Sequence, residues 1–228
     1  MPEKEQNLRL VAASQIREMR RLEREEGWVL SEQWNRDVVD YLDSLNGIYG
    51  LLNYLKELGN SSILDIGAGG KRAITELAKG KLGRDFNFYA TILTGDTGSE
   101  ISNLAFRKTS AEALRGIEDS SIGLVLASSS IAYSKAMPLV VESVDRVLIP
   151  GGVIKSVFKE SGQSHSRDLR QTSGEAEKLF SLKGYDIFSS NGIMLAVKSG
   201  FAKARSASSL YKSNSTFMDI VALYNQAD

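Results

Sequence analysis

The feature that most constrains the fold is a short apolar segment that runs directly into glycines. Residues 63–69 read Ile-Leu-Asp-Ile-Gly-Ala-Gly, and residues 73–79 have the composition of a helix. Glycines permit a tight turn and a close approach of ligand to backbone, and the start of a helix presents free N–H groups. The sequence therefore predicts a strand, a ligand-binding loop and a helix in succession, the context that a Gly-x-Gly motif requires.

Two classes of ligand compete for a loop of this kind. A dinucleotide site normally has a third glycine where the pyrophosphate meets the helix, and Arg72 occupies that position here. Asp65, two residues before the first glycine, would repel a pyrophosphate and attract a positively charged amino group. The loop therefore favours a ligand with an amino group.

The rest of the chain alternates between predicted strands and helices, which implies an α/β fold with a mostly parallel sheet and helices on both faces. The strands are expected at 63–66, 86–93, 104–108, 123–127, 153–158, 185–188 and 193–198. Helices are expected at 73–79, 111–114, 137–148 and 175–182, with a turn at 150–152. Asn191-Gly192 separates the last two strands and is typical of a β-hairpin, so this pair should be antiparallel.

Four segments resemble, in order and spacing, motifs of the class I S-adenosylmethionine-dependent methyltransferases. They are Leu64–Gly69, Ser110–Leu114, Asp119–Val125 and Arg146–Gly152. The terminal hairpin is similar to the inserted seventh strand of that family. The resemblance implies a Rossmann-like sheet of seven strands with an antiparallel terminal hairpin, and S-adenosylmethionine as the cofactor.

The resemblance also implies which residues contact the cofactor, all at the carboxyl ends of strands or in the loops that follow. They are Asp65, Gly67, Ala68 and Gly69 for the methionine part, Ser110, Ala111 and Glu112 for the adenine, and Ala127 and Ser128 near the sulfonium.

Three positions depart from the family pattern. No acid ends the second strand, Tyr89–Thr94, where the family has a carboxylate for the ribose; Asp96 is the candidate replacement. Ser110 and Gly123 each stand where the family has aspartate. A lost charge-assisted hydrogen bond costs about 1.5–3 kcal/mol, so a catalytically inactive protein that binds a partner remains an alternative to the enzyme.

The predicted reaction is methylation of a small molecule at oxygen or nitrogen. His165, the single histidine, is the candidate general base because its pKa is ordinarily near neutrality. The candidate substrate contacts are mostly aromatic, which suits a flat acceptor: Trp28, Trp34, Tyr41, Ser129 and Tyr133. The alternative interpretation of Trp28 and Trp34 is that they pack the N-terminal helices on the sheet.

Composition limits the chemistry and the partners. The chain has no cysteine, which excludes thiolate catalysis and cysteine-ligated zinc, and we expect no metal site. Its 28 basic and 28 acidic residues balance, which disfavours a nucleic-acid partner. With no long apolar run and a charged N-terminal segment, we expect a cytoplasmic protein without membrane contact.

A length of 228 residues suits one globular domain. We expect an N-terminal helical extension at 1–59, the methyltransferase-like domain at 60–199 and a tail at 200–228. A homodimer or a protein partner stays open, and so does methylation of RNA or protein.

Overall fold

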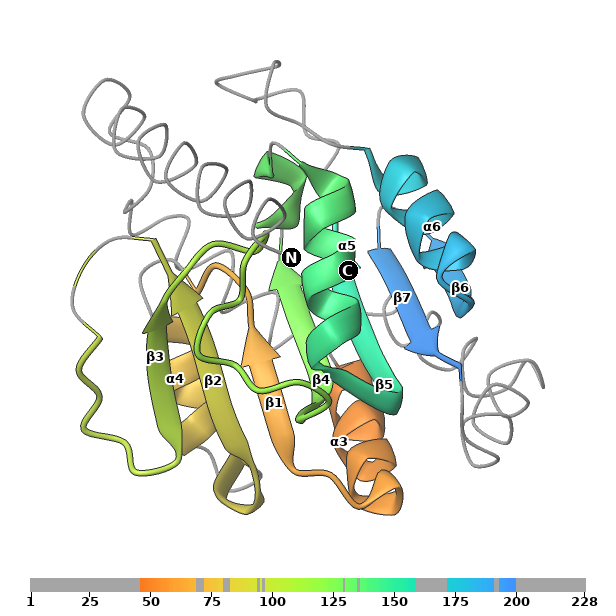
Figure 1. The fold of residues 1–228 in the computed structure, drawn as a ribbon. Helices are drawn as coiled ribbons and strands as arrows, with labels where there is room; N and C mark the ends of the chain where they lie inside the picture. Colours follow the sequence, from red (N-terminus) through yellow and green to blue (C-terminus); the bar gives the residue numbers. More distant parts are fainter. Residues whose placement is uncertain are drawn as a thin grey trace, which may run out of the picture.

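The structure is a computed structural model that describes residues 46–68, 72–79, 83–93, 95, 97–128, 130–134, 136–158, 172–190 and 193–199. The described part forms one seven-stranded sheet with helices on both faces (Figure 1). The α/β fold class predicted from the sequence is confirmed.

The strands follow the order β3-β2-β1-β4-β5-β7-β6 across the sheet. Their bounds are β1 Ser62–Asp65, β2 Asn87–Ile92, β3 Leu104–Lys108, β4 Ile122–Ser128, β5 Leu148–Val157, β6 Tyr185–Ser190 and β7 Ile193–Lys198. All neighbours are parallel up to β5, and β7 is antiparallel to both β5 and β6. The antiparallel terminal hairpin is therefore confirmed.

Among the described helices, two cover each face of the sheet. Helices α3 (Asn46–Leu58) and α4 (Arg72–Lys79) share one apolar core with the sheet, and α5 (Met137–Val147) and α6 (Ser173–Leu182) share the other. Figure 1 shows α5 in front of the sheet and α4 behind it. Short 3-10 turns occur at Gly83–Asp85 (η1) and Ile131–Tyr133 (η2). Among the described helices, none is both long and apolar enough to cross a bilayer.

Two local predictions were wrong. The expected turn at 150–152 lies inside β5, as a register shift in its pairing with β4. The expected helix at 111–114 is a hydrogen-bonded turn: the Ser110 carbonyl accepts the N–H groups of Ala113 and Leu114. Leu114 then has a φ of 42°, in the left-handed region, which ends the turn before a helix can form.

Gly123 is a point of close approach between α3 and the sheet. A Cβ on Gly123 would lie 2.6 Å from Asn60 Oδ1 and 2.7 Å from Leu55 Cδ2. Asn60 is fixed there because its Oδ1 accepts the Ser62 N–H at 2.8 Å and its Nδ2 donates to the Ser121 carbonyl at 3.3 Å. The space that the aspartate of the related family would need is therefore filled by this turn.

We expect Gly123→Ala to lower the free energy of unfolding by about 1–3 kcal/mol, because the extra methyl group overpacks a fixed polar turn. Gly174→Ala in α6 is the matched control, since a Cβ there meets nothing within 4 Å. Urea unfolding followed by circular dichroism measures both. Equal stabilities of the two variants would contradict the packing argument.

Candidate functional site

The loop after β1 is held from both sides by neighbouring strands. The Ile66 N–H donates to the Leu126 carbonyl of β4 at 2.8 Å. On the β2 side, Thr91 accepts twice: its Oγ1 accepts the Gly67 N–H and its carbonyl accepts the Ala68 N–H, each at 2.9 Å. Gly67 has a φ of +73°, which favours glycine. Thr91 thus fixes the glycine loop, a role that no sequence motif indicated.

Asp65 is the last residue of β1 and is half-buried directly before this loop. Burial raises the pKa of its carboxyl to about 7. Within the described part of the chain, no cation or hydrogen-bond donor pairs with it. An ionised carboxylate without a partner is unfavourable in such a site, so a bound ammonium group would stabilise its charged form.

A second loop packs directly on the glycine loop. A Cβ on Gly67 would lie 2.6 Å from the Cβ of Ser130, the residue before η2. The Ser130 Oγ is buried and has no hydrogen-bond partner. Ser130 was not among the residues singled out from the sequence, because only the fold brings the ends of β1 and β4 together.

The turn at 110–114 contributes further buried polar atoms. The Ser110 Oγ has no hydrogen-bond partner. Glu112 is 1% exposed: its Oε1 accepts from Ser134 Oγ at 2.9 Å, its Oε2 has no partner, and its carbonyl accepts from Ser143 Oγ at 2.7 Å. The Glu112 carboxylate therefore anchors the turn to the segment after β4, while Ser110 is 2% exposed and Ala111 is half-buried.

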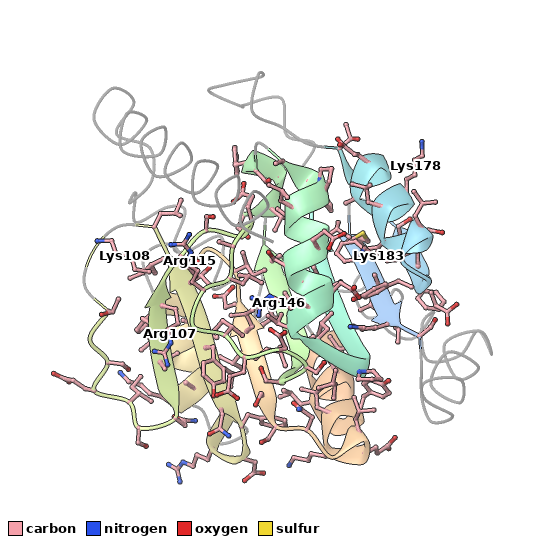
Figure 2. The ribbon with its side chains drawn as sticks, viewed as in Figure 1. Arg107, Lys108, Arg115, Arg146, Lys178 and Lys183 are labelled. Atoms are coloured by element: carbon pink, nitrogen blue, oxygen red, sulfur yellow. The ribbon has the colours of Figure 1, made fainter. Side chains whose placement is uncertain are left out.

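Arg146 of α5 holds the segment between β3 and β4. Its guanidinium donates to the carbonyls of Leu114 and Ile117, each at 3.0 Å, and pairs with Asp119. Figure 2 shows Arg146 at the side of α5 that faces this segment. Arg146 is the first residue of the Arg146–Gly152 segment noted in the sequence, and its hydrogen bonds position the turn that carries Ser110.

The carboxyl edge of the sheet thus gathers Asp65, Gly67, Ala68, Ala127 and the backbone of Ser128, with the 110–112 turn beside it. Strand β2 ends at Ile92, which is 4% exposed, so no carboxylate stands at its end. Tyr133 is half-buried at the end of η2. The other predicted site residues lie outside the described residues: Trp28, Trp34, Tyr41, Gly69, Asp96, Ser129 and His165.

Residues 64–155 match the family model of a methyltransferase domain, and the strand order carries the antiparallel seventh strand that the resemblance implied. Residues 64–155 are therefore a methyltransferase domain. The resemblance to methyltransferases that the sequence indicated is confirmed over this range.

Several solved methyltransferase structures are similar to this chain. They include the 1,6-didemethyltoxoflavin-N1-methyltransferase of Burkholderia thailandensis (16% identity, 74% of this chain and 90% of that chain, TM-score 0.49). A methyltransferase of Aquifex aeolicus (15%, 64% and 87%, 0.47) and a type 11 methyltransferase of Sulfolobus solfataricus (16%, 66% and 92%, 0.47) are also similar. Comparison with curated proteins gives no match.

The methyltransferase domain implies S-adenosylmethionine as cofactor, and the described residues fit its two ends. The carboxylate of Asp65 and the buried hydroxyls of Ser110 and Ser130 lack partners, which a ligand with an amino group and polar ring atoms supplies. Gly67 leaves the loop without a side chain at its closest point to Ser130. The ribose position does not fit in the same way, because Ile92 ends β2.

We expect Thr91→Val to lower the free energy of unfolding by about 1–3 kcal/mol, because the partly buried Gly67 N–H loses its acceptor. Thr91→Ser keeps the hydroxyl and serves as the control. Hydrogen exchange of the Gly67 amide, followed by NMR, should be faster in Thr91→Val than in Thr91→Ser. Identical exchange in both variants would show that the Thr91 hydroxyl does not hold the loop.

We expect Asp65→Asn to stabilise the ligand-free protein at pH 8 and to do so much less at pH 5. The carboxyl pKa is about 3.9 in an unfolded chain and about 7 in the folded protein. As pH rises between these values, the Asp65 carboxyl loses its proton in the unfolded state before it does so in the folded state. The free energy of unfolding of the wild type therefore falls, while that of Asp65→Asn does not change for this reason. Urea unfolding at both pH values measures the difference, with Asp186→Asn as the control. A gain that is equal at the two pH values would contradict the assignment.

Proposed function

We propose that this protein binds S-adenosylmethionine at the carboxyl edge of β1 and β4 and transfers its methyl group to oxygen or nitrogen of a small molecule. The observation that carries the proposal is Asp65: a carboxylate without a described partner, at the end of a strand, beside a glycine loop that neighbouring strands hold rigid. The bound cofactor supplies an electrophilic methyl group on its sulfonium.

Each end of the cofactor has residues to hold it in this proposal. Asp65 accepts hydrogen bonds from the amino group of the methionine part, and the Gly67–Ala68 backbone and Ser130 Oγ lie next to Asp65. Ser110 and Ala111 bind the adenine, with Glu112 fixing their turn. Ala127 and Ser128 end β4 near the sulfonium. Asp96 remains the proposed ribose contact.

Methyl transfer depends on alignment of the acceptor atom with the methyl group more than on acid–base groups. A base is required only if the acceptor must first lose a proton, and His165 keeps that proposed role. The acceptor pocket in this proposal is walled by Trp28, Trp34, Tyr41, Ser129 and Tyr133. The zero net charge of the chain supports a small molecule over RNA.

A second candidate function rests on a specific observation. No acid stands at the end of β2, whose last residue, Ile92, is buried. A protein that keeps the fold but binds a partner through its surface is the alternative that this residue favours.

Isothermal titration calorimetry with S-adenosylmethionine and S-adenosylhomocysteine tests the proposal. We expect micromolar binding to the wild type, and at least a tenfold weaker affinity for Asp65→Ala, equivalent to about 1.4 kcal/mol. Asp186→Asn on the edge strand β6 controls for the loss of one negative charge. If the folded wild type binds neither ligand at millimolar concentration, the enzyme proposal fails and the partner-binding function takes its place.

A further inference from the structure

A second ionisable side chain stands level with Asp65 on the same face of the sheet. Asp65 of β1 is paired with Leu126 of β4, and Leu126 is paired with Lys155 of β5. Paired residues on neighbouring parallel strands point to the same face. Asp65, Leu126 and Lys155 therefore form one row across the sheet, on the face that α3 and α4 cover.

Lys155 is a buried cation in apolar surroundings. It is 4% exposed and lies among Leu126, Val153 and Leu195, and its burial lowers the pKa of its ammonium to about 8. None of the ion pairs between described residues includes Lys155. An apolar residue of similar size would make this core more stable, so the fold alone does not account for a lysine here.

The two opposite charges of this row do not neutralise each other. Adjacent strands are about 4.8 Å apart, which puts the Cα atoms of Asp65 and Lys155 about 10 Å from each other, with β4 between them. The other described carboxylate on this face of β1, β4, β5, β7 or β6 is Asp186. Asp186 lies on the edge strand β6. The residue of β6 that is level with Lys155 is Phe188, and Asp186 comes two residues before it.

We propose that Lys155 binds the α-carboxylate of the methionine part of S-adenosylmethionine, opposite Asp65, which binds its α-ammonium group. The inference rests on the proposed function. A half-buried carboxylate and a buried ammonium, separated by one strand, match the charge pattern of a free α-amino acid.

The dimensions of an α-amino acid agree with this separation. Its nitrogen and carboxylate oxygens are about 3 Å apart, and a charge-assisted hydrogen bond at each end adds about 2.8 Å. The total of about 9 Å is the separation required between an Asp65 oxygen and the Lys155 nitrogen, which side chains whose Cα atoms are about 10 Å apart can adopt. The flexible four-carbon stem of Lys155 adjusts the remainder.

Three ligands separate the two charged ends of the cofactor. S-adenosylhomocysteine has both the ammonium and the carboxylate, its decarboxylated analogue S-adenosyl-3-thiopropylamine has the ammonium alone, and 5′-methylthioadenosine has neither. Calorimetric titration of each ligand into the wild type, Lys155→Met and Asp65→Asn therefore assigns each charge to a residue. Lys178→Met is the control, because Lys178 is exposed on the outer side of α6 (Figure 2).

We expect Lys155→Met to weaken S-adenosylhomocysteine binding by about 10- to 100-fold, as for loss of a charge-assisted hydrogen bond, and to leave the affinities of the other two ligands unchanged. Asp65→Asn should weaken both ligands that have the ammonium and spare 5′-methylthioadenosine. Lys155→Arg, which keeps the charge, should retain part of the preference for the carboxylate. Thermal melts of the free variants verify folding, and Lys155→Met should melt no lower than the wild type.

Two results overturn the assignment of Lys155. If Lys155→Met binds S-adenosylhomocysteine as tightly as the wild type does, the ammonium serves another anion, such as a carboxylate of the acceptor. If it weakens all three ligands equally, its role is structural. A wild type that binds none of the three overturns the proposed function itself, which is a distinguishable outcome.

Discussion

The candidate site depends on how one residue, Thr91, satisfies two backbone N–H groups of the glycine loop. Its side chain and its carbonyl hold Gly67 and Ala68, while β4 holds Ile66. Because these backbone N–H groups already donate to the protein, the conformation of the loop does not depend on a bound ligand. A loop ordered in advance loses little entropy on binding, and it keeps Asp65 at the mouth of the site with a constant orientation.

Polar groups without partners concentrate where that rigid loop meets the carboxyl edge of the sheet. The hydroxyls of Ser110 and Ser130 are buried without a hydrogen-bond partner, and no described residue pairs with the charged groups of Asp65 and Lys155. Such groups reduce stability, and proteins generally tolerate that reduction at functional sites. The apolar clusters on both faces of the sheet, held by α3 and α5 among others, supply the stability that permits it.

Local patterns predicted the fold well, and long-range pairing explains what they missed. Alternating apolar segments located all seven strands, and Asn191-Gly192 located the antiparallel hairpin. Thr91 and Ser130 had no local signal, because their contacts with the glycine loop cross between strands. Lys155 was one polar residue in a predicted strand, and only the register with Leu126 places it level with Asp65. The helix predicted at 111–114 failed because Leu114 turns left-handed.

The apolar end of β2 changes how a cofactor would be recognised. With no acid at the end of β2, the described residues offer no charge-assisted contact to the ribose. Two charged contacts to the methionine part, each worth about 1.5–3 kcal/mol, would more than offset one lost at the ribose. Recognition would then depend on the amino acid rather than on the nucleoside. A site of that kind would bind adenosine and its phosphates more weakly than the cofactor, since neither has an ammonium for Asp65, and phosphates would meet a negative charge there.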